Sequence, residues 1–277
     1  MRLFILLFAV TAWAADPTAA IRSKLSAGDL SSATAILEDH QLANGEDAGY
    51  WNGFSWLARG AATLGQDDKA LRWARQIQQK ASWATPEWNV PLGAAIEVEA
   101  MVTGKNNRRA AAAYLKPLLE RAKGHAIESR LWKNYNLLTL IGQDAPALPG
   151  VKFDRPTVMY FWAHWCGDCK AQAAGLARVA KQHPEVQWLA PTRTYADHLG
   201  VEAEEAKERE SIDKAWAELY APTGIAAPII DRASMIRYGV SSTPTFVMVD
   251  GRGKVRLYQP TRFTDAELEA AIARLKN

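Results

Sequence analysis

The chain has 277 residues, of which 48% are hydrophobic, so it is long enough to form two domains with packed cores. Its 33 basic and 30 acidic residues give a formal net charge of +3, and the sequence has no basic run of the kind that binds a phosphate backbone. This balance argues against nucleic acid as a partner.

Residues 1–15 have the pattern of a secretory signal peptide. Arg2 precedes an apolar run from Leu3 to Val10, and Ala12-Trp13-Ala14 gives the small-x-small pattern of a cleavage site. The alternative is an uncleaved membrane anchor, but the run is far shorter than the ~20 apolar residues of a membrane-spanning helix. We therefore expect an exported chain that is soluble outside the cytosol after the signal peptide is removed.

Residues 16–143 have the periodicity of helices. Apolar residues recur three and four positions apart, and the stretches 67–80 and 106–123 predict amphipathic helices. Gly28, Gly65 and Gly104 recur at nearly equal spacing, each after an apolar stretch and before another helix. This pattern is typical of repeated helical hairpins and resembles a degenerate tetratricopeptide array.

Six tryptophans of the helical region have two interpretations. Packing between helices is the simpler one, because aromatic side chains contribute much of the buried area in such cores. The alternative is a concave surface that binds peptides, which helical arrays often provide. The six are Trp51, Trp56, Trp73, Trp83, Trp88 and Trp132.

The proline- and glycine-containing segment 144–156 predicts a linker, and residues 157–277 alternate between strand and helix patterns. Strands are expected at 157–163, 186–191, 227–231, 245–250 and 254–259, and helices at 170–183, 201–220 and 264–276. Thr264 and Glu267 predict a capping box for the last helix. The expected fold class is an all-α domain of helical hairpins followed by an α/β domain.

The only two cysteines, Cys166 and Cys169, lie between the first strand and the first helix of the α/β domain. A structural disulfide would close too short a loop to stabilise the fold much. A zinc site would need further ligands, and the five histidines show no paired spacing that supplies them. Redox exchange by the cysteine pair is the best remaining interpretation, with no metal and no other cofactor.

Two separated motifs make residues 147–277 resemble the thioredoxin superfamily. One is Phe161-Trp162-Ala163-x-Trp165-Cys166-x-x-Cys169-Lys170 after a strand, and the other is the segment from Tyr238 to Val255. The sequence of residues 228–246 and the segment inserted after the second strand resemble the TlpA/ResA group of periplasmic thiol-disulfide oxidoreductases. The resemblance implies a reductase whose clients are proteins with cysteines or disulfides, and a membrane thiol relay as the electron donor.

The positions of the cysteines suggest their roles. Cys166 stands where the strand ends and the helix begins, so unpaired N–H groups and the helix dipole should lower its pKa and make it the attacking sulfur. Cys169, one turn further along the helix, would then resolve the mixed disulfide. Trp165 either shields the site and contacts the substrate or simply packs.

Gly167 and Asp168, between the cysteines, are expected to tune the redox potential. The negative charge of Asp168 disfavours a thiolate at Cys166, which predicts a reducing couple. The alternative is a favourable helix N-terminal charge without any redox effect. A protonated His164 would act the other way, but histidine is mostly neutral at neutral pH.

Pro244 matches the cis-proline of the family, and the resemblance implies that Thr243 presents its backbone to an extended substrate peptide. One residue departs from the family pattern. Many thioredoxins have a buried acid six positions before the first cysteine, where this chain has Tyr160. Water could accept the proton instead, and so could an acid of the inserted segment: Glu202, Glu204, Glu205 or Asp213.

Two other functions stay open from the sequence. A client-binding adaptor would use the helical region for recognition and the second domain as a redox switch. A copper(I)-handling protein would use the same cysteine pair as ligands, although the five methionines are not clustered in the sequence.

Overall fold

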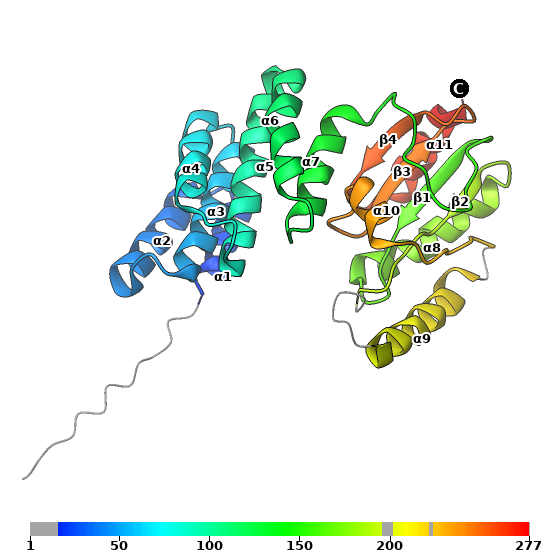
Figure 1. Ribbon diagram of the computed structural model, residues 1–277, viewed down its shortest axis with the longest axis horizontal. Coiled ribbons are helices and arrows are strands. Elements are labelled where there is room, and N and C mark those ends of the chain that lie inside the picture. Colours follow the sequence, from blue (N-terminus) through cyan, green and yellow to red (C-terminus); the bar gives the residue numbers. More distant parts are fainter. Residues whose placement is uncertain (1–15, 196–201, 222–223, 277) are drawn as a thin grey trace, which may run out of the picture. The chain divides into compact units, whose positions relative to one another are not determined.

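The computed structural model describes residues 16–195, 202–221 and 224–276 (Figure 1). The predicted signal peptide, residues 1–15, lies outside this range. The chain divides after Val102 into two compact units, of which the first is helical where it is described and the second contains a sheet. The expected fold class is confirmed. No helix within the described ranges is long and apolar enough to cross a membrane.

Helical hairpins build the first unit. Its elements are α1 (Thr18–Ser26), α2 (Leu30–Asn44), α3 (Ala48–Thr63), α4 (Asp67–Lys80), a 3-10 turn (Pro86–Trp88) and most of α5 (Asn89–Asn106). Gly28 and Gly65 form the turns of the two hairpins with φ values of 78° and 75°. Glycine adopts this left-handed region without a steric cost, which explains both positions.

Gly104 does not form the third turn that the spacing predicts. It lies inside α5, and the chain turns instead at Asn107, whose side chain accepts the N–H of Ala110 at 2.9 Å and caps α6 (Arg108–Arg121). A Cβ at position 104 would lie 3.0 Å from Leu138, in α7 (Glu128–Thr139). The glycine therefore serves close helix packing and not a turn.

The tryptophans of the first unit contribute to its core. Trp51 is buried and its ring contacts Trp88 at a centroid distance of 5.1 Å. Trp56, Trp73 and Trp88 are half-buried against the same apolar cluster. Packing is confirmed for these four, and a peptide-binding surface stays a prediction.

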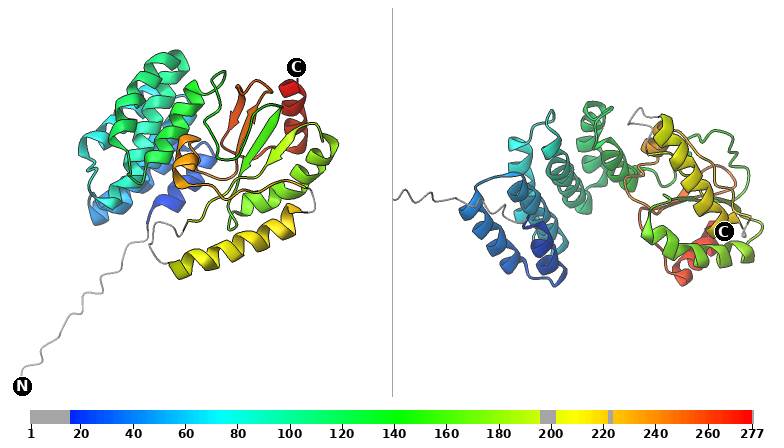
Figure 2. Two further views of the ribbon diagram at one scale, coloured as in Figure 1. Left: turned by 45° about the vertical axis from the view of Figure 1, so that its right-hand side comes forward. Right: turned by 90° about the horizontal axis from the view of Figure 1, so that it is seen from below.

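The sheet of the second unit has the strand order β2-β1-β3-β4 (Figure 2). β1 (Thr157–Phe161) pairs in parallel with β2 (Gln187–Leu189) and antiparallel with β3 (Thr245–Val249), which pairs antiparallel with β4 (Val255–Gln259). The strand expected at 227–231 is not formed, because this segment makes only an isolated bridge from Ile229 to Thr192.

Apolar clusters cover both faces of the sheet. On one face, α8 (Gly167–Gln182) and α11 (Asp265–Lys276) pack on alternate residues of β1 and β3, with Ile212 of α9 (Glu202–Leu219) in the same cluster. On the other face, α10 (Arg232–Arg237) contributes Met235. The predicted capping box of α11 is confirmed, since Thr264 N donates to Glu267 Oε2 at 2.8 Å and Glu267 N donates to Thr264 Oγ1 at 3.3 Å.

By its contacts, the hairpin of α6 and α7 belongs to the second unit. Asn136 of α7 donates a hydrogen bond to the carbonyl of Arg237 at 2.9 Å, and the N–H of Gly142 donates to the carbonyl of Val255 in β4 at 2.8 Å. These contacts attach α7 to the sheet. The division of the chain into a helical domain at 16–143, a linker at 144–156 and a domain at 157–277 stays a prediction.

Gly239 allows α7 to approach the segment after α10 closely. Its φ is 65°, and a Cβ there would lie 2.5 Å from the backbone nitrogen of Lys133. Gly150 has a similar φ of 75°, but a Cβ at that position would meet nothing within 4 Å. Replacing each glycine by alanine therefore distinguishes two contributions to the loss of stability. Position 150 reports the backbone conformation alone, and position 239 reports the backbone conformation together with the contact with α7.

Gly239→Ala should lower the free energy of unfolding by about 2–4 kcal/mol. Alanine is strained at this φ, and its Cβ would in addition displace α7. Gly150→Ala should cost only the backbone strain, about 1–2 kcal/mol. Urea denaturation of both variants of the full chain measures the difference. Equal losses would show that the close contact with α7 contributes nothing to stability.

Candidate active site around the cysteine pair

The two cysteines form a disulfide at the start of α8, with their Cα atoms 5.2 Å apart. Cys166 is the N-cap of the helix, and the backbone N–H of Cys169 donates to its Sγ at 3.1 Å. In the reduced state this N–H and the helix dipole would stabilise negative charge on the same sulfur. Cys166 is 5% exposed and Cys169 is fully buried, so the first sulfur is the more accessible of the two.

The turn before β3 lies beside the accessible sulfur. The peptide bond from Thr243 to Pro244 is cis, as predicted, and the carbonyl oxygen of Thr243 lies 3.4 Å from Cys166 Sγ. The pairing of β1 with β3 explains this proximity, because Phe161 and Thr245 are register partners at the ends of the two strands. The structure brings the predicted residues together, and their binding of substrate stays a prediction.

Trp165 borders the site on the surface. Its side chain is 58% exposed, and its ring packs edge to face against Tyr195 with the centroids 5.3 Å apart. The guanidinium of Arg193 lies over the Tyr195 ring at 4.1 Å. Trp165 is therefore not packed in a core, and its contact with substrate stays a prediction.

Asp168 has a cationic partner that the sequence did not predict. It lies in the first turn of α8, with its Oδ1 3.4 Å from Arg262 Nη1. Both side chains are more than half exposed, so the pair contributes at most about 1 kcal/mol to stability. Arg262 nevertheless offsets part of the negative charge near Cys166. Space is open around Gly167, and redox tuning by Gly167 and Asp168 stays a prediction.

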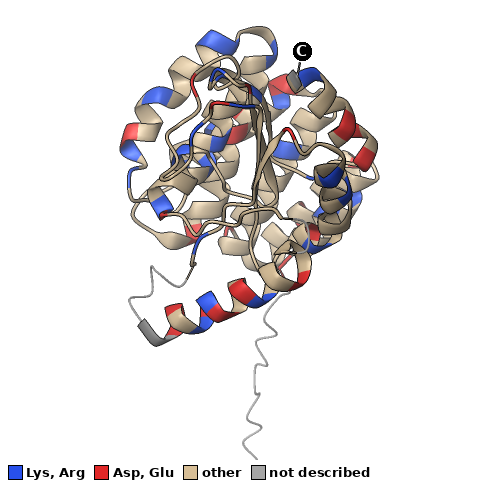
Figure 3. Ribbon diagram, turned by 90° about the vertical axis from the view of Figure 1, so that its right-hand side faces the viewer, with Lys and Arg blue, Asp and Glu red and all other residues tan. Residues whose placement is uncertain are grey.

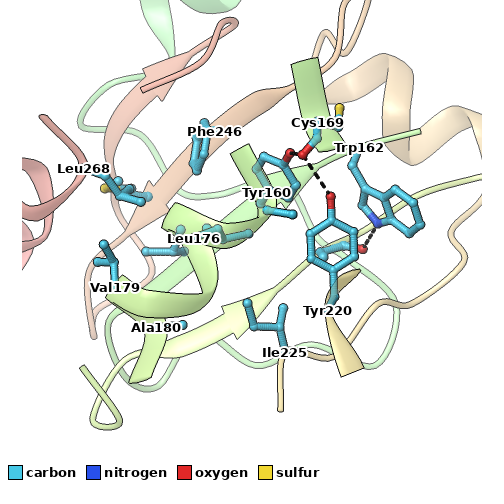
Figure 4. Packing of buried hydrophobic residues seen from close by; sticks show 14 of the residues in the cluster. Tyr160, Trp162, Cys169, Leu176, Val179, Ala180, Tyr220, Ile225, Phe246 and Leu268 are labelled. Carbon is cyan, nitrogen blue, oxygen red and sulfur yellow. Dashed lines mark hydrogen bonds between the residues drawn. The ribbon is translucent and has the colours of Figure 1, made fainter. Parts of the chain in front are cut away.

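Two buried tyrosines lie behind the disulfide (Figure 4). The hydroxyls of Tyr160 and Tyr220 both donate to the carbonyl oxygen of Cys169, at 3.0 and 3.3 Å. Burial, followed by the neighbouring Tyr220, raises the pKa of Tyr160 far above its ordinary value, and burial raises the pKa of Tyr220 to about 12. Neither hydroxyl is therefore a base near neutral pH, and the two instead fix the first turn of α8.

Glu208 of α9 is an almost buried carboxylate beside the site. Its side chain is 10% exposed, its Oε2 accepts the N–H of Tyr195 at 2.7 Å, and its Oε1 lies 3.8 Å from Nδ1 of His164. Burial lowers the pKa of His164, and the attraction of Glu208 acts in the opposite direction without reversing the shift. His164 is therefore neutral at neutral pH.

Three of the four acids that the sequence suggested as proton acceptors, Glu204, Glu205 and Asp213, have described side chains and do not occupy this position. Glu204 pairs with Lys207 and Glu205 with Arg209 along α9 itself, and Asp213 is exposed. The side chain of Glu202 lies outside the described part of the chain. Figure 3 shows acidic and basic residues alternating along this helix, consistent with the solvated face that its composition predicts.

A helical pattern could have indicated Glu208. It lies four residues before Ile212, which packs in the core, so both side chains lie on the same face of α9. An acid on the apolar face of a helix is a sequence signal for a buried carboxylate, and Glu208 is not among the four acids named above. Within residues 16–195, 202–221 and 224–276, no group of three or more His, Cys, Asp or Glu side chains is arranged to hold a metal ion.

Three solved structures are similar to part of this chain. A secreted disulfide oxidoreductase of Mycobacterium tuberculosis, homologous to E. coli DsbE, is 21% identical with a TM-score of 0.37, over 44% of this chain and 83% of that chain. A putative thiol:disulfide interchange protein DsbE from Chlorobium tepidum is 25% identical with a TM-score of 0.40, over 49% and 96%. StoA from Bacillus subtilis is 16% identical with a TM-score of 0.33, over 43% and 83%.

A search of curated proteins found no match to the sequence. The family model described as a Thioredoxin-like domain matches residues 152–276. The matched region contains all four strands of the sheet and the Cys-x-x-Cys pair at the start of α8. Residues 152–276 are therefore a thioredoxin-like domain with a Cys-x-x-Cys pair.

Proposed function

We propose that the protein is an exported thiol-disulfide oxidoreductase that reduces disulfides in client proteins. The observation that carries this proposal is the position of Cys166, whose Sγ accepts the N–H of Cys169 at 3.1 Å at the start of α8. A sulfur in this position is favoured as a thiolate, which is the form that attacks a disulfide. The family match at 152–276 supports the same chemistry, and the signal-peptide pattern supports export.

The reaction needs two exchanges. The Cys166 thiolate attacks one sulfur of the client disulfide, so that a mixed disulfide forms and the other client sulfur leaves as a thiolate and takes a proton. The Cys169 thiolate then attacks Cys166 Sγ and releases the second client thiol. The client gains two electrons and two protons, and the protein is left with the Cys166–Cys169 disulfide. A thiol donor must then reduce this disulfide, and we propose a membrane thiol relay for that step.

The buried position of Cys169 suits the second exchange. Because Cys169 is fully buried, an external disulfide reaches it less readily than Cys166. The two tyrosine hydroxyls bonded to its carbonyl fix its backbone one turn behind the attacking sulfur. This arrangement supports a division of roles, with attack at Cys166 and resolution at Cys169.

The two cysteine variants should fail at different steps. With dithiothreitol as donor, Cys166→Ser should lose reduction of insulin disulfides completely, because no attacking thiolate remains. Cys169→Ser should still attack but should accumulate a mixed disulfide, which non-reducing electrophoresis and mass spectrometry detect. Substantial activity in Cys166→Ser, or a stable adduct at Cys169, would contradict the assignment.

The reducing direction rests on the charges near Cys166, and two variants should shift the potential in opposite directions. Asp168→Asn removes a negative charge, stabilises the thiolate and should raise the midpoint potential. Arg262→Ala removes the neighbouring positive charge and should lower the potential. Each shift should be about 5–20 mV at low ionic strength, since both groups are exposed. Equilibration with glutathione buffers measures both, and two shifts of the same sign would rule out a charge effect.

The first unit is proposed to select clients, and the structure indicates where to cut the chain. A truncation that ends at Val102 leaves α6 and α7 with the second unit, to which they belong by their contacts. In cells, Cys169→Ser should trap mixed disulfides, and removal of residues 16–102 from this variant should change the set of trapped proteins. As a control, the truncated protein with Cys169 intact should still reduce hydroxyethyl disulfide. If it does, and the full-length and truncated Cys169→Ser variants trap the same proteins, then the first unit does not select clients.

A further inference from the structure

Trp165, which directly precedes Cys166, and Tyr195 form an aromatic pair in which Trp165 is exposed and Tyr195 is half-buried against the core. Their rings meet edge to face, with the centroids 5.3 Å apart, and Trp165 is 58% exposed. A client in a mixed disulfide is bonded to Cys166 Sγ, so its residues beside the reacting cysteine must cover the neighbouring surface. Trp165 directly precedes Cys166 in the chain, and its exposed ring belongs to this neighbouring surface.

The carboxylate of Glu208 contacts the chain segments that carry the two aromatic residues. Its Oε2 accepts the backbone N–H of Tyr195 at 2.7 Å, and its Oε1 faces Nδ1 of His164, the residue before Trp165, at 3.8 Å. The carboxylate thus contacts both segments from which the two rings project. With only 10% of its side chain exposed, Glu208 does not itself offer a contact to a client.

We propose that Glu208 is a positioning residue for client recognition, which holds Tyr195 against Trp165 so that the pair binds an aromatic side chain next to the client's reacting cysteine. This inference rests on the proposed function. An aromatic side chain is the partner that suits an exposed Trp165 ring supported by the half-buried Tyr195 ring, because edge-to-face and offset contacts add to the gain from buried area. Fixed rings bind better than free ones because less conformational entropy is lost on binding.

The test compares two peptides and one small disulfide. Each peptide carries a single cysteine as a mixed disulfide with glutathione, flanked by tyrosines in one peptide and by serines in the other. Hydroxyethyl disulfide is too small to reach the aromatic pair once it reacts at the sulfur. Stopped-flow measurement with the pre-reduced full-length protein gives a second-order rate constant for each substrate.

The unmodified protein should react with the tyrosine peptide about 3- to 10-fold faster than with the serine peptide, the range expected for one aromatic contact. Glu208→Ala should reduce this ratio towards one and leave the rate with hydroxyethyl disulfide within about twofold. Trp165→Ala should also reduce the ratio between the two peptides, and the double variant should reduce it no further, because both residues act on one surface.

Two further variants separate positioning from a general structural role. Glu208→Gln keeps an oxygen that can accept the Tyr195 N–H, so it should restore most of the peptide preference. Glu210→Ala removes an exposed glutamate from the same helix and should change nothing. If Glu208 had only a general structural role, Glu208→Ala would lower the rates with both peptides and with hydroxyethyl disulfide together. The ratio between the two peptides would then stay unchanged.

The possible failures can be told apart. No reaction of the unmodified protein with hydroxyethyl disulfide would overturn the proposed function itself. Normal reaction with hydroxyethyl disulfide but equal rates with both peptides would overturn the aromatic surface. A peptide preference that persists in Glu208→Ala but is lost in Trp165→Ala would overturn the role of Glu208 alone.

Discussion

The hydrogen bond from the N–H of Cys169 to Sγ of Cys166 is the constraint on which the site depends. At the starts of α2, α3 and α10 a carboxylate of aspartate accepts the equivalent N–H, but at α8 a sulfur takes this place. A thiolate is a better acceptor than a sulfur in a disulfide, so reduction should strengthen the cap. The sulfur of Cys166 is therefore also the atom that caps the N-terminus of α8.

The surroundings of the disulfide differ between its buried and its exposed sides. On the buried side, neutral hydroxyls of Tyr160 and Tyr220 hold the carbonyl of Cys169, where burial makes a charge costly. On the exposed side, Asp168 pairs with Arg262 in a position that water can screen. The charged pair thus lies on the exposed side of the disulfide, whereas the backbone of Cys169 is fixed by neutral groups.

The sequence predicted those parts of the structure that depend on local patterns. The helix at 67–80 and the capping box of Thr264 and Glu267 follow from residues close together in the chain, and the cysteine pair between a strand and a helix indicated the fold. The strand predicted at 227–231 was wrong, because its β-branched residues fit a strand but the segment makes only one isolated bridge, from Ile229 to Thr192. The contact of Glu208 with His164 could not be predicted. The two residues are far apart in the sequence, and their proximity depends on how α9 packs against the rest of the domain.

The inserted segment that contains α9 contacts the site at two places. Glu208 lies beside the aromatic pair, and Tyr220, directly after the helix, reaches the carbonyl of Cys169. These residues are separated by about 18 Å along a helix axis, and Ile212 between them is anchored in the core. The segment of α9 and Tyr220 therefore contacts both the backbone of Tyr195 and the backbone of Cys169. Because Ile212 lies between these two contacts in the chain, a shift of this segment would act on the aromatic pair and on the first turn of α8 together.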